Sequence, residues 1–211
     1  MQTKPNGKRQ AILAAATELF LEEGYGAASI NRLIERIGGS KSTVYAHFDS
    51  KEKLFEAVVE SVIGELPTLI GKEQLESCDL REGLYAVSER LLEVVTSNRH
   101  LELARIVVAE ADRFPEVGRI YYEHGPNHIC EVLTAFVAAR ARAESLHIPQ
   151  PRETVEAFTG MLLHHWIFRR FCVDPNPPSK AEVKKTAARA ATLFLAALAG
   201  GGETRPQGGA A

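Results

Sequence analysis

The chain has 211 residues, of which 45% are apolar and 25% are charged, and its formal net charge is −2. This length can bury one large core or two modest ones, and the composition is typical of globular proteins. No apolar run is long enough to span a membrane, and the nearly neutral charge gives no indication of nucleic acid.

The charge and the cysteines are unevenly distributed along the chain. Residues 1–54 carry eight Lys and Arg against six Asp and Glu, a net charge of +2, which leaves −4 for the remainder. A basic first segment on an acidic body is expected. The polar residues 1–10 lack the apolar core of a signal peptide, and the three cysteines are widely spaced without a CxxC pair. We therefore predict a cytoplasmic protein with reduced thiols.

Helical periodicity runs through most of the chain, and strand signals are nearly absent. Apolar residues recur at helical spacing from Ile12 to Phe20, and Gly24 and Gly26 close this first helix.

The segment from Ser29 to Leu54 predicts a helix-turn-helix. Ser29 can cap the second helix, and the pair Gly38 and Gly39 can form the turn because glycine reaches positive φ without a Cβ clash. Ser40 can cap the third helix, which carries polar residues instead of a full apolar stripe. A helix that reads DNA needs one packed face and one face that offers partners to phosphates and bases.

Asp49 or Ser50 caps a fourth helix, and longer helices follow it. The expected ranges are 81–97, 100–112, 116–143, 153–172 and 180–199. Ser179 and Glu182 form a capping box at the start of the last helix. We therefore predict an all-α fold. It has a three-helix helix-turn-helix DNA-binding head at 1–66, a helical ligand-binding and dimerisation body at 67–200, and a disordered tail at 201–211.

The string GSKSTVYAHFDSKEKL, from Gly39 to Leu54, resembles the DNA-binding domain of the TetR/AcrR family of bacterial transcriptional regulators. The similarity runs from about Arg9 to Val59. One departure is Gly39, where the family usually has an apolar residue, often valine. The segment RFPEVGRIYYEHGPNHICEVLTAFV, from Arg113, is similar to the AefR-like subgroup of C-terminal domains. The resemblance implies a homodimer with a helical ligand-binding body that releases DNA when a small molecule binds.

The resemblance and the residue chemistry together predict a DNA-binding surface. The predicted DNA-binding residues are Ser29, Arg32, Lys41, Ser42, Thr43, Tyr45, Ala46, His47 and Lys51. The resemblance assigns Thr43, Tyr45 and Lys51 to phosphates, which hydroxyl and ammonium groups suit. Base reading then falls to the polar and small residues of the third helix, since lysine favours guanine and alanine can meet a thymine methyl group. The alternative is that these are ordinary polar residues on a solvated helix.

Two aromatic clusters in the body suggest a small-molecule site, because such sites combine apolar walls with a few polar groups. The predicted ligand-binding residues are Phe114, Tyr121, Tyr122, His124, Trp166, Phe168 and Arg169. Core packing is the alternative use of aromatic residues at helical spacing.

Small and apolar residues on the last two helices suggest a dimer interface of the four-helix type. The predicted interface residues are Met161, Leu162, His165, Ala187, Ala191, Phe194 and Leu198. A monomer could bury the same face internally.

A metal site at His124 and His128 is the other possibility that we considered, since metal ligands on a helix can have this spacing. Pro126 lies between the two histidines, and the only third ligands nearby are Glu123 and Cys130. Solvated or capping histidines are therefore favoured, and we predict no metal and no cofactor.

The sequence thus predicts a dimeric repressor that binds double-stranded DNA at a palindromic operator and is released by a small, apolar effector. The alternative is a DNA-binding regulator that is controlled by a metal, by oxidation or by a protein partner. A remote alternative is a helical enzyme with an accessory DNA-binding head, because the sequence contains no nucleophile elbow, phosphate loop or carboxylate pair with a base. We predict a protein that is not an enzyme and has no membrane partner.

Overall fold

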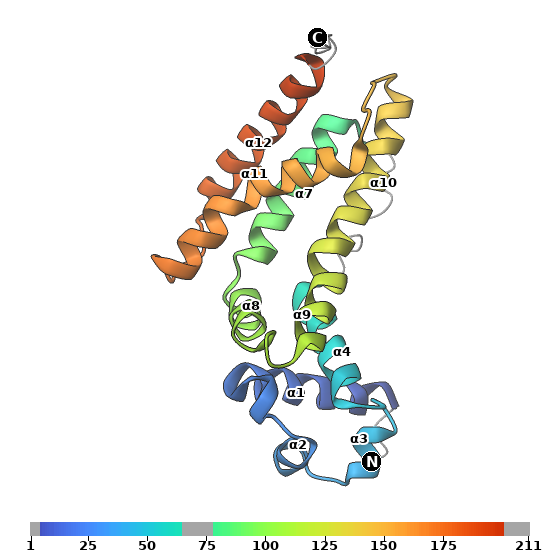
Figure 1. The fold of residues 1–211 in the computed structure, drawn as a ribbon, viewed down its shortest axis with the longest axis vertical. Helices are drawn as coiled ribbons and strands as arrows, with labels where there is room; N and C mark the ends of the chain where they lie inside the picture. Colours follow the sequence, from blue (N-terminus) through green and yellow to red (C-terminus); the bar gives the residue numbers. More distant parts are fainter. Residues whose placement is uncertain (1–4, 65–77, 201–211) are drawn as a thin grey trace, which may run out of the picture. The chain divides into compact units, whose positions relative to one another are not determined.

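The computed structural model describes residues 5–64 and 78–200, and these residues form helices without a strand (Figure 1). This confirms the predicted all-α fold. None of the described helices has the length and apolar character needed to cross a membrane. The predicted boundary at residues 66 and 67 and the tail at 201–211 lie outside the described residues.

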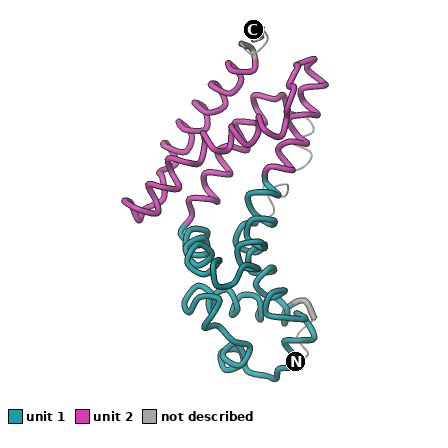
Figure 2. The backbone as a smooth tube through the Cα atoms, in the orientation of Figure 1, with its two compact units in different colours: residues 1–65, 98–129 teal, residues 66–97, 130–211 magenta. Residues whose placement is uncertain are grey.

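The chain divides into two compact units (Figure 2), one of residues 1–65 and 98–129 and one of residues 66–97 and 130–211. The first unit contains α1 (Pro5–Ala27), α2 (Ile30–Ile37), α3 (Lys41–Tyr45), α4 (Lys51–Ile63), α8 (Asn98–Glu110), α9 (Pro115–Tyr122) and the π-helix η1 (Glu123–Asn127). The second contains α7 (Leu80–Val95), most of α10 (His128–Ala143), α11 (Pro151–Cys172) and α12 (Lys180–Gly200). The first unit thus combines helices of both predicted domains, and the assignment of functions to these domains stays a prediction.

Serine side chains cap the helices of the helix-turn-helix as the sequence predicts. The hydroxyl oxygens of Ser29, Ser40 and Ser50 accept hydrogen bonds from backbone N–H groups three residues later, at 3.3, 3.3 and 3.1 Å. Each bond satisfies one of the N–H groups that a helix leaves without a partner at its start. The capping box of Ser179 and Glu182 at the start of α12 is also confirmed, with bonds of 2.9 and 3.3 Å.

The turn between α2 and α3 depends on glycine. Gly38 has φ 68° and ψ 164°, and Gly39 has φ 109°. The region of Gly38 is occupied almost only by glycine. We expect Gly38→Ala to lower the free energy of unfolding by about 1–3 kcal/mol through backbone strain alone, since no atom lies within 4 Å of an added Cβ.

Chemical unfolding of the purified variant measures this loss. Asn31→Ala, at an exposed position of α2, is the matched control and is expected to stay within about 0.5 kcal/mol of the parent protein. A Gly38→Ala protein as stable as the parent would show that the turn is not strained.

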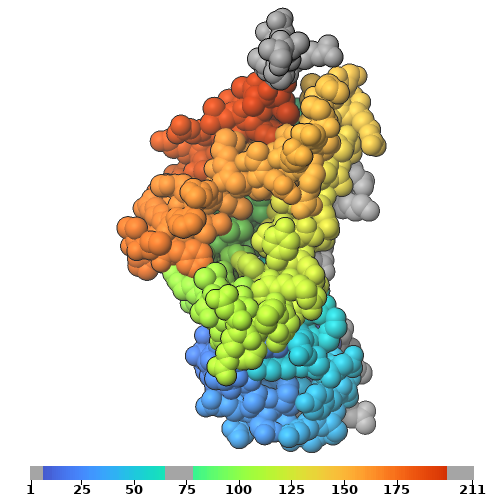
Figure 3. Space-filling model, viewed as in Figure 1, coloured from blue at the N-terminus to red at the C-terminus, as the bar shows by residue number. Residues whose placement is uncertain are grey.

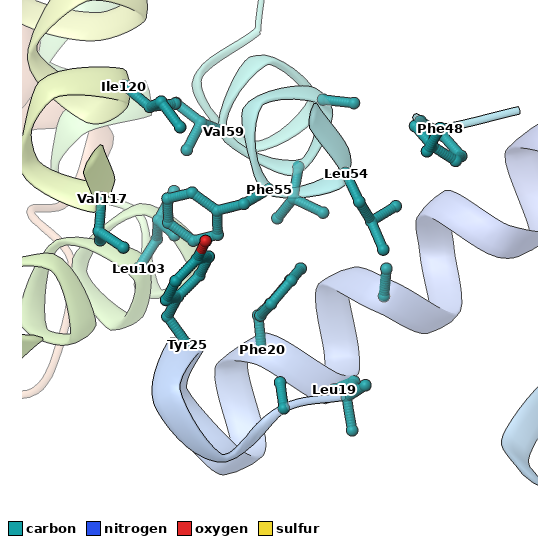
Figure 4. Packing of buried hydrophobic residues seen from close by; sticks show 14 of the residues in the cluster. Leu19, Phe20, Tyr25, Phe48, Leu54, Phe55, Val59, Leu103, Val117 and Ile120 are labelled. Atoms are coloured by element: carbon teal, nitrogen blue, oxygen red, sulfur yellow. The ribbon is translucent and has the colours of Figure 1, made fainter. Parts of the chain in front are cut away.

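The core of the first unit joins α1 and α4 to α8 and α9 (Figure 4). The ring of Phe55 on α4 meets the rings of Phe20 and Tyr25 edge-to-face, with centroids 5.3 and 5.1 Å apart. Such contacts add to the stabilisation that burial of the rings provides. The side chains that α8 and α9 contribute to the same core include Leu103, Val107, Val117 and Ile120. The DNA-binding helices therefore share their core with later segments of the chain.

In the second unit, α7, α11 and α12 pack against one another. Phe158 of α11 contacts Phe194 of α12, with ring centroids 4.8 Å apart. The buried Arg170 guanidinium donates to the backbone carbonyls of Thr96 and Asp174, at 3.1 and 2.9 Å. A buried charge is tolerated when hydrogen bonds replace its water, so these bonds hold the end of α11 in place.

A buried polar pair makes the stability of the first unit depend on pH. His100 is 5% exposed, and its Nε2 shares a hydrogen bond of 2.9 Å with the Tyr121 hydroxyl. Burial lowers the pKa of His100 from 6.5 to about 4. As the pH falls, His100 takes up a proton near pH 6.5 in the unfolded chain and only near pH 4 in the folded chain. The neutral, buried His100 therefore contributes its full share of the folding stability above pH 6.5, and this contribution is lost as the pH falls to 4. The loss amounts to about 3 kcal/mol at most.

We expect His100→Gln to lose less stability than the parent protein between pH 7 and pH 4.5. Urea unfolding at both pH values measures the difference. His128→Gln, which changes an exposed histidine, should leave the pH dependence unaltered. Equal losses in the His100→Gln and parent proteins would mean that His100 is protonated normally in the folded state.

Candidate nucleic-acid interface

The helix-turn-helix is anchored by one buried residue in each of its two short helices. Leu33 of α2 and Val44 of α3 are 0% and 1% exposed, and both belong to the core of the first unit. Phe48, just after α3, is buried as well. With these side chains packed inward, the remaining face of α3 lies at the surface.

This outer face carries the side chains that the sequence assigned to DNA. The exposed residues are Lys41, Ser42, Tyr45 and Ala46, and the half-buried ones are Thr43 and His47. The hydroxyl of Ser40 lies 2.7 Å from that of Ser42 and 3.1 Å from that of Thr43. The arrangement offers an ammonium group, hydroxyls and a phenol from a single helical turn, as phosphate and base-edge contacts require.

The two predicted residues of α2 have additional partners. The Ser29 hydroxyl caps the helix, so its structural role is established, while a phosphate contact stays a prediction. Arg32 is exposed and forms an ion pair with Glu23 at 2.7 Å. A phosphate would have to compete with this carboxylate for the guanidinium.

Lys51 differs from the other predicted phosphate ligands in its surroundings. Its ammonium lies over the ring of Tyr25, 4.3 Å from the centroid, and is half-buried. Burial lowers the pKa of Lys51, and the nearby Glu110, Glu52 and Glu116 oppose that shift. The contact ties the start of α4 to the end of α1, so Lys51 has a structural partner whether or not it also reaches DNA.

In the first unit, the predicted ligand-binding residues do not line one common space. Phe114 packs on Tyr25, with ring centroids 5.4 Å apart, and the hydroxyl of Tyr121 is hydrogen-bonded to the buried His100. Tyr122 is 57% exposed, and His124 faces two carboxylates of α4. A hollow of about 470 Å³ involves Phe114 but none of the other three; its lining residues are Glu23, Gly26, Ala27, Ala109, Glu110, Arg113 and Phe114.

In the second unit, Trp166 is largely buried and donates from its indole nitrogen to the Thr186 hydroxyl at 3.2 Å. The Arg169 guanidinium lies over the Trp166 ring and pairs with Asp174 at 2.8 Å. Phe168 is 58% exposed, because its neighbours along α11 on the inward face are Trp166 and Arg170. Its ring therefore lies on the outside of α11, and its assignment to a ligand stays a prediction.

The predicted dimer residues divide into two groups. Leu162, Ala187, Ala191 and Phe194 are at most 6% exposed, because the inward faces of α11 and α12 pack on each other and on α7. These four are already covered within one chain, so their assignment to a dimer interface stays a prediction. Met161 and His165 are exposed, and Leu198 is half-buried. The outer surface of α11 and α12, orange to red in Figure 3, therefore carries the exposed part of the predicted interface.

The structure brings together one group of side chains of metal-binding type that the sequence did not indicate. Glu56 and Glu60 of α4 lie beside His124 of η1, and one donor atom from each lies within 4.8 Å of the others. The sequence pairs His124 only with its neighbours along the chain, such as His128. The carboxylates come from a distant segment, so only the packing of α4 against η1 brings them together.

Family models match both parts of the chain. The model for bacterial regulatory proteins of the tetR family matches residues 12–58, which include the helix-turn-helix. The model for the C-terminal domain of AefR-like transcriptional repressors matches residues 82–199. Together they span most of the described residues of both units.

Two curated relatives each match over less than half of the chain. The transcriptional activator FasR of Mycolicibacterium smegmatis is 32% identical over 88 residues, or 42% of this chain and 40% of that protein. The transcriptional repressor AcnR of Corynebacterium efficiens is 36% identical over 72 residues, or 34% of this chain and 38% of that protein. The chain thus spans less than half the length of these relatives.

Solved structures match along nearly the whole chain. A TetR-family transcriptional regulator from Mesorhizobium loti MAFF303099 is 30% identical with a TM-score of 0.76, covering 92% of this chain and 98% of that one. The flavonoid-responsive regulator FrrA is 25% identical with a TM-score of 0.75, covering 91% of this chain and 97% of that one. The arrangement of helices described above is therefore shared with regulators of transcription.

Proposed function

Because this chain belongs to the TetR family of transcriptional regulators, we propose that it binds a palindromic operator as a homodimer and represses transcription there. The family and the similar proteins are regulators, which confirms the prediction that the chain is not an enzyme. Repression, dimerisation and release by a small apolar effector are our proposals for this particular chain.

The observation that carries the proposal is the outer face of α3. Its helix is capped by Ser40 and anchored by Val44, and it presents Lys41, Tyr45 and Ala46 to solvent. A recognition helix needs this combination of a fixed seat and a polar, exposed face to enter the major groove. The phenol suits a phosphate, whereas the ammonium and the small side chain suit base edges.

The homodimer is supported by exposed apolar side chains on the outside of α11 and α12. Met161, Phe168 and Leu193 are 46%, 58% and 48% exposed. Met161 and Phe168 lie seven residues apart, so they share one face of α11, with His164 and His165 between them. Exposed apolar side chains gathered on one surface favour burial against a partner. A two-fold dimer would present two copies of α3 to two half-sites of one operator.

The effector is the least defined part of the proposal. FrrA is named as flavonoid-responsive, and its similarity along both units supports a small, largely aromatic effector for this chain. Trp166 and Arg169 are the predicted ligand residues that combine a flat apolar surface with a charge in the second unit. An effector acts by binding the DNA-free conformer more tightly than the DNA-bound one.

The direction of regulation has two precedents among the relatives, the activator FasR and the repressor AcnR. Repression is favoured by the C-terminal match, which is to AefR-like repressors and covers residues 82–199.

A mobility-shift assay on the DNA upstream of the coding region tests the proposal. We expect a complex with two protomers per operator, protection of two half-sites about 10 base pairs apart or a multiple of this, and loss of the complex on addition of a flavone. Transcription in vitro from that promoter should fall as the protein is added. Equal affinity for the upstream DNA and for a scrambled duplex would contradict operator recognition.

A further inference from the structure

We propose that Glu56, Glu60 and His124 form a binding site for a divalent transition-metal cation on the first unit. One oxygen of each carboxylate and one ring nitrogen of the histidine lie within 4.8 Å of one another. This inference goes beyond DNA binding and effector release, and it depends on neither.

The imidazole of His124 lies within reach of both carboxylates, one at each ring nitrogen. His124 Nε2 lies 3.4 Å from Glu56 Oε1, and His124 Nδ1 lies 3.2 Å from Glu60 Oε1. Zinc binds histidine nitrogen and carboxylate oxygen at about 2.0–2.2 Å in a tetrahedron, which puts neighbouring ligand atoms about 3.4 Å apart. These two contacts use different ring nitrogens, so binding requires the imidazole to turn until one nitrogen and one oxygen of each carboxylate meet at the cation, with the fourth position open to water.

The backbone around His124 favours this arrangement. Glu56 and Glu60 are four residues apart on α4 and so share one face of the helix. His124 lies in η1, a π-helical turn, and such turns are frequent at functional sites. The next residue, Gly125, is buried, and a Cβ there would lie 2.9 Å from the Ile63 side chain. Glycine at this position thus lets η1 approach α4 closely enough for the histidine to reach both carboxylates.

The charges at the site also favour a cation. Two carboxylates at this helical spacing repel each other, and a bound cation would remove that repulsion. Glu56 and His124 are partly shielded, with side chains 22% and 29% exposed, so water screens the interaction incompletely. The Lys53 ammonium donates a hydrogen bond to Glu56 Oε2 at 2.6 Å, and the other carboxylate oxygen, Oε1, faces the histidine. The imidazole selects the class of metal, since nitrogen ligands suit zinc, nickel or copper and magnesium requires oxygen.

Isothermal titration of the full-length, metal-stripped protein with zinc chloride tests the site. We expect the parent protein to bind one zinc ion per chain. Glu60→Gln and His124→Asn should each bind it at least 10-fold more weakly or not at all, since even residues that only support the ligands change metal affinity by about 10–100-fold. Lys53→Ala should instead bind zinc more tightly, because it removes a competing positive charge. Glu60 and Lys53 are exposed, so these two variants should keep the parent circular dichroism spectrum.

His128→Asn is the matched control, because His128 is exposed and follows η1 directly. It should bind zinc as the parent protein does, and millimolar magnesium should not displace the zinc. Zinc binding that is unchanged in Glu60→Gln and His124→Asn would overturn the proposal and assign the ion to other groups, such as the thiols. Loss in His128→Asn without loss in Glu60→Gln would overturn it in favour of a histidine pair. No DNA is present in these titrations, so their failure would not count against operator binding.

Discussion

Replacing both Lys41 and Tyr45 with alanine is expected to lower operator affinity by roughly 100- to 1,000-fold, because each contact is lost twice in a dimer. Both side chains lie on the exposed face of α3, so their removal should leave the core around Val44 intact. Replacing Lys51 alone, which the resemblance assigns to phosphate, should change the salt dependence of binding. The slope of log K against log salt concentration should fall in magnitude by about 1.8, since one phosphate contact is lost from each of two protomers.

Fluorescence anisotropy with a labelled operator, repeated at several salt concentrations, measures both quantities. Lys180→Ala provides a matched control, because it removes an exposed lysine from the start of α12. Its affinity and salt slope should equal those of the parent protein. If the double variant still bound the operator as tightly as the parent at physiological salt, α3 would not be the recognition helix.

Replacing Phe168 with glutamate is expected to dissociate the dimer, with the dissociation constant rising at least about 100-fold. The side chain is 58% exposed on the outside of α11, so the protomer itself loses no core contact. In a two-fold interface the substitution puts two carboxylates in place of two rings. Burying unpaired charges costs several kcal/mol, and aromatic side chains carry a large share of interface energy.

Sedimentation equilibrium over a range of protein concentrations gives the dissociation constant. Val108→Glu is the appropriate control, since Val108 is 77% exposed on α8, in the other unit, and receives the same charge. This control should remain dimeric. A dimeric Phe168→Glu protein would move the interface away from this face of α11, and a monomeric parent protein would exclude the homodimer altogether.

Local chemistry explains why much of the fold can be read from the sequence. The serine caps at positions 29, 40 and 50 and the capping box at Ser179 depend on residues within one helical turn. The same holds for the turn, where Gly38 and Gly39 both adopt positive φ. At Gly39, where the resemblance leads us to expect an apolar residue, φ is 109°, a value that valine rarely adopts. Valine at this position would therefore strain the turn that this chain adopts.

The parts that could not be predicted depend on contacts between distant segments. Helical spacing places Leu162 and Phe194 on the apolar faces of their helices. It does not show whether α7 of the same chain or a second subunit covers these faces. The group of Glu56, Glu60 and His124 has no spacing signature at all, because its members come from α4 and η1. Lys51 was assigned to phosphate by resemblance, and its position over Tyr25 follows from the packing of α1 on α4.

The shared core of the first unit bears on the construction of hybrid regulators. A fusion cut near residue 66 would transfer α1 to α4 without Leu103, Val117 and Ile120, which are at most 3% exposed in the intact chain. The transferred segment would present Phe55 to water or to an unrelated surface. A hybrid that exchanges operator specificity should therefore graft only the outer residues of α3, such as Lys41 and Tyr45, onto an intact recipient.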